Sequence, residues 1–133
     1  MTYALDSNIV SYLLKDNDVV YSHYISALEN DSPCVIPLIV YYEVRRGLKS
    51  SGATVQMQLF DSLCSDLGVC DLTAKDIDTA ADIYADRKRR GIMIDDADLL
   101  IAAQAITRGY TLVTHNVRHF ENIDGLKFVD WVE

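Results

Sequence analysis

Two acidic side chains stand where short apolar runs give way to segments of helical spacing. Asp6 follows a β-type run at the N-terminus, and Glu43 lies inside an apolar stretch, where an unpaired charge is costly. Each has an ordinary alternative. Asp6 can cap a helix, and Glu43 can pair with Arg45, Arg46 or a cation of another helix, or face solvent on an amphipathic helix. Asn8, two residues after Asp6, offers a polar helper. The functional alternative is that Asp6 and Glu43 bind the same metal ion.

A third acidic group strengthens that alternative. Asp95, Asp96 and Asp98 fall within the first turn of an apolar segment, where the helix dipole favours anions but their mutual repulsion disfavours so many together. A bound cation would relieve that repulsion. Thr114 and Asn116 follow a later strand and add a hydroxyl and an amide oxygen. Oxygen donors of this kind favour Mg²⁺ or Mn²⁺ over Zn²⁺.

Other catalytic classes lack their signatures. His115 and His119 have the spacing of a zinc-peptidase helix, but Asn116 stands where that motif needs its glutamate. A phosphatase with two aspartates would need an acid at Asn8. The chain has no glycine-rich phosphate loop and no nucleophile elbow.

The charge balance limits how a nucleic acid could bind. The net charge of −8 argues against broad electrostatic capture, so cations would have to offset the acids if the substrate is a phosphodiester. The run Arg87, Lys88, Arg89 and Arg90 reads either as a solvated helix terminus or as a contact for substrate phosphates. The two interpretations are compatible with each other.

Short β-type runs alternate with segments of helical spacing along the whole chain. Strands are expected at residues 2–5, 34–36, 69–72, 111–113 and 126–129. Helices are expected from about residue 9, over 20–28, over 38–48 with an end near Gly47, over 54–67, from 73 to about 90 with a Thr73–Asp76 capping box, from Asp95 or Asp96 to near Gly109, and briefly over 116–120.

This alternation predicts one α/β domain over residues 1–133, with a short central parallel sheet flanked by helices on both faces. Ligands of such sheets bind at the carboxyl ends of the strands, where Asp6 and Thr114 stand. The three cysteines are expected to be buried, reduced thiols. No apolar run approaches the roughly 20 residues that span a bilayer, and no basic leader is present, so a cytoplasmic protein is expected.

Four motifs resemble PIN-domain nucleases, especially the VapC-type toxins of toxin–antitoxin pairs. The motifs are residues 3–8 (YALDSN), 42–47 (YEVRRG), 96–103 (DADLLIAA) and 112–116 (LVTHN). Carried over by position, Asp6, Glu43 and Asp98 resemble the main metal-site acids, and Asp96 a frequent additional acid. Asn116 matches a fourth position that is often Asp, and His119 one that is often acidic. These two departures weaken the case for a second metal.

The resemblance implies an endoribonuclease that uses Mg²⁺ or Mn²⁺, a homodimer, and a small cognate antitoxin that inhibits it across the acidic pocket. A dimer would cover Val10, Leu13 and Leu14. Two rival functions stay open. One is a PIN-fold binding or regulatory module with little catalysis, which Asn116 and His119 would permit. The other is a flap-type DNA nuclease, although such proteins resemble longer chains.

Overall fold

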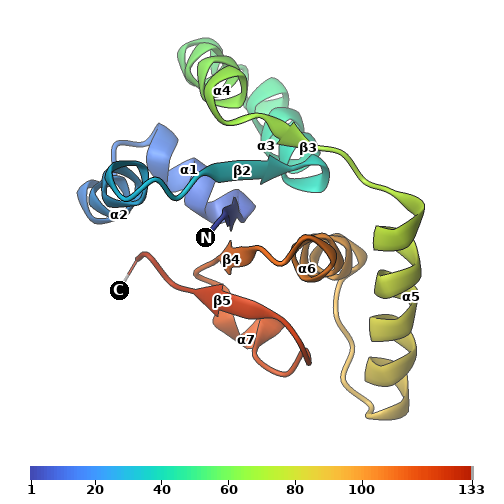
Figure 1. Cartoon of the computed structure of the whole chain (residues 1–133). Coiled ribbons are helices and arrows are strands. Elements are labelled where there is room, and N and C mark those ends of the chain that lie inside the picture. The colour runs from blue at the N-terminus through green and yellow to red at the C-terminus, as the bar shows by residue number, and fades with distance from the viewer. Residues whose placement is uncertain (133) are drawn as a thin grey trace.

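Five short strands form one parallel sheet at the centre of the fold (Figure 1). The computed structural model describes residues 1–132. In the order β3-β2-β1-β4-β5, the strands are β1 (Tyr3–Leu5), β2 (Cys34–Pro37), β3 (Val69–Cys70), β4 (Thr111–Val113) and β5 (Lys127–Val129). Every neighbouring pair is parallel, which confirms the predicted sheet type. Strand β3 is shorter than expected and stops before residues 71 and 72.

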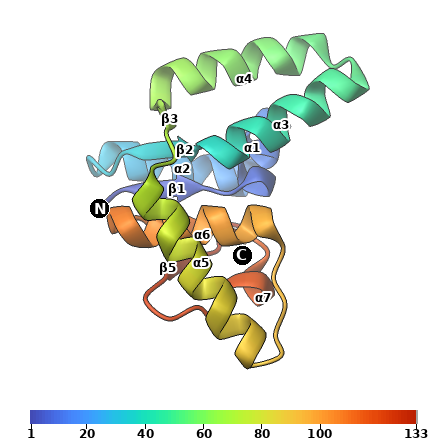
Figure 2. The same ribbon diagram turned by 90° about the vertical axis from the view of Figure 1, so that its right-hand side faces the viewer.

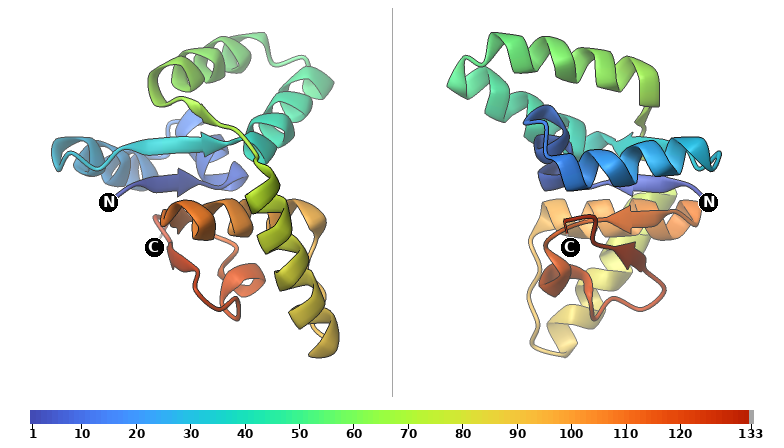
Figure 3. Two further views of the ribbon diagram at one scale, coloured as in Figure 1. Left: turned by 45° about the vertical axis from the view of Figure 1, so that its right-hand side comes forward. Right: turned by 90° about the vertical axis from the view of Figure 1, so that its left-hand side faces the viewer.

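Helices cover both faces of this sheet. They are α1 (Ser7–Leu14), α2 (Asp18–Glu29), α3 (Leu38–Ser51), α4 (Thr54–Leu67), α5 (Ala74–Arg89), α6 (Asp96–Arg108) and α7 (Val117–Phe120). Helices α5 and α6 lie over one face (Figure 2), whereas α1 and α2 lie over the other (Figure 3). The α3–α4 hairpin stands over the β2–β3 side of the sheet. This arrangement confirms the three-layer α/β prediction.

Side chains next to the helix starts explain several element boundaries. The Asp6 carboxylate accepts a hydrogen bond from the Ser7 N–H, and Asn17 accepts one from the Val20 N–H. Thr73 and Asp76 form the predicted reciprocal capping box of α5. Asp95 occupies the N-cap position of α6, but its side chain makes no capping hydrogen bond. A hydrogen bond from a nearby side chain therefore marks the start of α1, α2 and α5.

The expected end of α3 near Gly47 is wrong. The helix continues one turn further to Ser51 and ends at Gly52, whose φ of 70° is the left-handed conformation that glycine adopts without steric cost. Gly47 lies inside the helix, where a glycine is tolerated at a cost in backbone entropy. The stop signal was therefore assigned to the wrong glycine.

The core joins α1 and α6 to the sheet between them. Helix α6 is buried in its middle, at Leu99 and from Ile101 to Ala105, as its apolar sequence predicts. Val10 and Leu14 of α1 are only 0% and 8% exposed, and Leu13 is partly buried against the same core. The expectation that a dimer would cover these residues is therefore wrong for Val10 and Leu14, which the monomer already buries.

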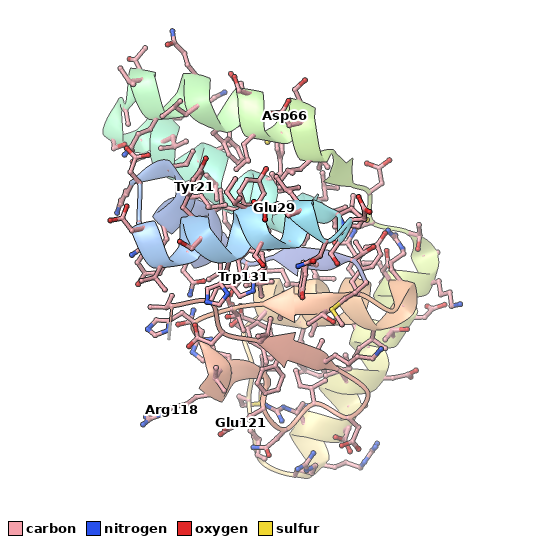
Figure 4. All side chains as sticks on the ribbon, turned by 60° about the vertical axis from the view of Figure 1, so that its left-hand side comes forward. Tyr21, Glu29, Asp66, Arg118, Glu121 and Trp131 are labelled. Atoms are coloured by element: carbon pink, nitrogen blue, oxygen red, sulfur yellow. The ribbon has the colours of Figure 1, made fainter. Side chains whose placement is uncertain are left out.

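The C-terminal segment closes the core from the side of α2. The ring of Trp131 packs edge-on against Tyr3 at 5.3 Å and stacks on His23 of α2 at 5.9 Å. Figure 4 shows Trp131 lying next to α2. These contacts tie the segment after β5 to the N-terminal half of the chain.

Two further sequence expectations concern the thiols and the membrane. All three cysteines are free, but only Cys34 is buried, while Cys64 and Cys70 are half-buried. Burial raises the pKa of the Cys34 thiol to about 12, which keeps it protonated at neutral pH. No helix within residues 1–132 is long and apolar enough to cross a membrane.

Candidate active site

Three helices begin at the carboxyl edge of the sheet and bring the predicted acids there. Asp6 joins β1 to α1, Glu43 lies in the second turn of α3, and Asp98 lies in the first turn of α6. The strands are parallel, so the helices that follow β1 and β2 start at the same edge. Figure 2 shows the starts of α1 and α6 on one side of the molecule, near α7.

Both oxygens of the Asp6 carboxylate have hydrogen-bond partners. Oδ1 accepts from the Ser7 N–H at 2.8 Å, and Oδ2 accepts from the Thr114 hydroxyl at 2.7 Å. Asp6 is only 4% exposed. Thr114, at the end of β4, also accepts from the Asn116 N–H at 3.0 Å. The neighbouring strands β1 and β4 therefore orient this buried carboxylate together.

Glu43 is held from the start of α1. Its Oε1 accepts a hydrogen bond from the Ser7 hydroxyl at 2.7 Å. The neighbouring arginines are engaged elsewhere, because Arg45 pairs with Asp61 and Arg46 lies over the Tyr42 ring at 5.0 Å. Within residues 1–132, no cation forms an ion pair with Glu43. Of the two ordinary alternatives for Glu43, the ion pair therefore does not occur among these residues.

Asp98 has a partner that sequence reasoning did not assign to it. Its Oδ2 lies 2.8 Å from Nδ1 of His119, which projects from α7. Helices α6 and α7 are neighbours at this edge, so residues 21 positions apart meet there. The sequence marked His119 as a departure from the family pattern but gave no signal for this pairing.

The charges of the three acids act on one another. Burial raises the pKa of Asp6, hydrogen bonds from Thr114 and Ser7 oppose that rise, and the charges of Asp98 and Glu43 add to it. Burial also raises the pKa of Asp98, and the hydrogen bond from His119 opposes the rise. Desolvation and like charge therefore both disfavour the ionised site, and the attraction of a bound cation would offset both costs.

The donor set suits a hard divalent cation. It consists of carboxylate oxygens with hydroxyl groups behind them, which is the chemistry that Mg²⁺ and Mn²⁺ prefer. Among residues 1–132, no three acidic, histidine or cysteine side chains are close enough to form a ready-made metal cluster. Water would therefore complete the coordination, as it usually does around Mg²⁺.

The remaining predicted residues lie at different distances from this centre. Asp96 is exposed and lines a largely apolar groove between α5 and α6 with Ile77 and Tyr84. Asn116 is exposed, and only its backbone contacts Thr114. The Asn8 Oδ1 atom is buried and accepts no hydrogen bond from the described residues. Of the four supporting residues, Thr114 alone is hydrogen-bonded to one of the three acids.

The basic run at the end of α5 divides into two parts. Arg87 is only 3% exposed, and its Nη1 donates to the Asn122 carbonyl at 3.1 Å. Arg90 donates to the same carbonyl at 3.3 Å and pairs with Asp86. Lys88 and Arg89 are exposed. The expectation of a solvated or phosphate-binding residue does not hold for Arg87, which is part of the interior.

Sequence reasoning missed the part played by Ser7. This residue contacts two of the three acids, through its backbone N–H to Asp6 and its hydroxyl to Glu43. A groove of about 250 Å³ continues from these groups between α1, α3 and α4, and Lys15 also lines it. The position of Ser7 between Asp6 and Asn8 was the available signal, but its reach to α3 depends on tertiary structure.

The fold and the acids at its carboxyl edge define a class of protein. The family model for the PIN domain matches residues 3–126. That match spans most of the chain, and the chain belongs to the PIN domain family.

Several relatives are similar to the chain over nearly its whole length. Ribonuclease VapC2 of Rickettsia felis is 31% identical over 132 residues, which cover 98% of each chain. The solved structure of VapBC2 from Rickettsia felis bound to a promoter DNA fragment has a TM-score of 0.90 at 31% identity, covering 98% of this chain and 99% of that one. VapBC-1 from nontypeable Haemophilus influenzae has a TM-score of 0.88 at 28% identity and full coverage of both chains.

Proposed function

We propose that this protein is an endoribonuclease that hydrolyses RNA phosphodiester bonds with Mg²⁺ or Mn²⁺ and is the toxin of a VapBC-type pair. The main support is that Asp6, Glu43 and Asp98 all lie in or next to the first turns of helices at the carboxyl edge of one sheet, where the charges of Asp98 and Glu43 raise the pKa of Asp6. Full-length relatives that carry the name ribonuclease VapC support the same activity.

The three acids would hold the cation, which when bound activates water and offsets the charge of the phosphate. The chain's own residues orient those acids. Ser7 holds Glu43 and one oxygen of Asp6, while Thr114 holds the other oxygen. Prearranged donors of this kind reduce the reorganisation that a reaction would otherwise require. The remaining lone pairs of the carboxylates are available to the cation.

The test is cleavage of a mixed RNA pool by purified protein with Mg²⁺, with Mn²⁺ and with a chelator. Asp98→Asn removes a site carboxylate, and Asp66→Asn is the matched control because Asp66 is exposed on α4 (Figure 4). We expect cleavage by the wild type and the control, only with metal. RNA binding without cleavage by the wild type would instead favour the regulatory module.

We also propose a cognate antitoxin that covers this site. The groove beside Glu43 runs between α1 and α3, so a partner segment lying there would reach the acids. An Arg or Lys of that segment could take the place of the cation through charge-assisted hydrogen bonds. The solved relatives named VapBC are consistent with such a partner.

Co-expression with the adjacent open reading frame tests this partner. We expect co-purification, relief of growth inhibition, and RNA cleavage that recovers as Mg²⁺ is titrated into the complex. Full toxicity with no co-purifying neighbour would remove the antitoxin from the proposal and leave a solitary nuclease.

A further inference from the structure

His119 is the basic side chain that contacts Asp98. Its Nδ1 lies 2.8 Å from Asp98 Oδ2, and the side chain is 54% exposed. The next residue, Phe120, is fully buried and fixes α7 to the core. His119 is therefore anchored on one side and open to solvent on the other.

The hydrogen bond to Asp98 determines which ring nitrogen is free. A carboxylate oxygen only accepts, so Nδ1 of His119 carries the hydrogen and donates it. Within residues 1–132, the His119 side chain makes no other hydrogen bond. Nε2 therefore faces away from Asp98, at the exposed rim of the acidic site.

Two cations of the basic run are engaged away from this position. Arg87 and Arg90 bind the Asn122 carbonyl. Arg118, which follows α7's first residue, points away from the molecule (Figure 4). Beside Asp98, an incoming RNA strand would therefore meet the imidazole of His119. Lys15 and Arg46 lie on the Glu43 side of the site.

We propose that His119 is a substrate-contacting residue, held by Asp98 so that its Nε2 binds the ribose–phosphate backbone at the bond to be cut. The inference rests on the proposed ribonuclease activity. In the neutral ring Nε2 accepts a hydrogen bond from a ribose 2′-hydroxyl, and in the doubly protonated ring it donates one to a phosphate oxygen. Both groups occur at every RNA linkage. Asp98 binds the ring through Oδ2, so its Oδ1 would be left for a cation.

Two substitutions separate a substrate contact from simple support of Asp98. His119→Asn keeps an N–H near the position of Nδ1, which can still bind Asp98, but it removes Nε2. His119→Ala removes both. His23→Asn is the matched control, because His23 stacks on Trp131 away from the acids. The substrate is a short fluorescent RNA whose sequence surrounds a cleavage site mapped in the mixed pool. A second version carries one 2′-deoxy nucleotide at the bond that is cut.

We expect both His119 variants to lose about tenfold to a hundredfold in kcat/KM, the value of one hydrogen bond to a charged partner. The Mg²⁺ concentration for half-maximal cleavage and the thermal midpoint should stay close to wild type in His119→Asn. If the 2′-deoxy substrate abolishes the difference between wild type and variant, the contact is to the 2′-hydroxyl. A difference that persists assigns the contact to phosphate.

Full activity in His119→Asn, with loss only in His119→Ala, would overturn the proposal, since the ring would then act through Asp98 alone. Unchanged activity in both variants would also overturn it. The same proteins are compared for RNA affinity by fluorescence anisotropy in chelator. If the wild type cuts no RNA, the proposed ribonuclease activity is wrong, and the RNA affinities still test the contact of His119. Equal affinities of wild type and His119→Ala would then overturn the contact, and weaker binding by the variant would support it.

Discussion

At the scale of single residues, Asp98 carries both a stability cost and the proposed activity. Its pKa is raised by burial, so holding the ionised carboxylate at neutral pH costs folding free energy. We expect Asp98→Asn to abolish metal-dependent RNA cleavage and to unfold at the same temperature as wild type or slightly higher at pH 7. Calorimetry and RNA cleavage on one preparation check this. Retained cleavage would move the chemistry elsewhere.

Ser7 offers a second prediction at this scale. Ser7→Ala removes the hydroxyl that binds Glu43 but leaves the backbone N–H that binds Asp6. We expect about a tenfold loss of RNA cleavage, equivalent to one hydrogen bond, and a higher Mg²⁺ requirement. Ser7→Thr, which retains a hydroxyl, should keep most of the activity. Equal cleavage by the alanine variant and wild type would show that Glu43 needs no such support.

At the scale of elements, a buried carboxylate joins α5 to α6. Asp76 is fully buried and accepts hydrogen bonds from Thr107, from the Thr73 N–H at 2.9 Å and from Arg108 at 2.7 Å. Burial alone would raise the pKa of Asp76, but these hydrogen bonds and the Arg108 charge outweigh it, and the pKa is lowered. The helix pair is therefore stabilised by the ionised form.

Asp76→Asn should lower the free energy of unfolding at pH 7 by about 2–4 kcal/mol, because it breaks a buried pair. A lowered pKa stabilises the fold above the ordinary value of 3.8, and this stabilisation is lost as the pH falls below it. The difference from wild type should therefore shrink in acid. Urea titrations at several pH values, with the exposed Asp78→Asn as control, test this.

Helix α3 provides a prediction about backbone entropy. Gly47 lies inside the helix, and a methyl group added there would meet no atom within 4 Å. We expect Gly47→Ala to raise the free energy of unfolding by about 0.5–1 kcal/mol. Gly52→Ala is the contrasting variant, because its φ of 70° strains any other residue. Denaturant unfolding that ranked the two variants in the opposite order would contradict this account of the helix end.

At the scale of the whole molecule, self-association remains a prediction, but the surface expected to mediate it now lies on α5 instead of α1. Val10 and Leu14 are inside the monomer, whereas Ile77 and Tyr84 of α5 are 47% and 40% exposed along a groove of about 360 Å³. We expect a homodimer that covers this groove, and Ile77→Glu should shift light scattering toward the monomer. A wild-type monomer at all accessible concentrations would contradict it.

The sequence alone was sufficient for most of the elements, and it singled out the three acids as candidate metal ligands. Strand runs, the Thr73–Asp76 capping box and the apolar α6 depend on interactions within a few residues, which can be recognised without coordinates. The position of Asp6, Glu43 and Asp98 followed from a general rule about parallel strands. The glycine that ends α3 escaped this reasoning, because two glycines five residues apart are locally alike.

Only the tertiary structure decided which side chains support those acids. Ser7 meets Glu43 across 36 positions, Thr114 meets Asp6 across 108, and His119 meets Asp98 across 21. The tertiary structure also places Arg87 in the interior and buries Val10 within the monomer. Such contacts depend on how helices pack around the sheet. Packing is set by shape and burial over the whole chain, which no local pattern of residues records.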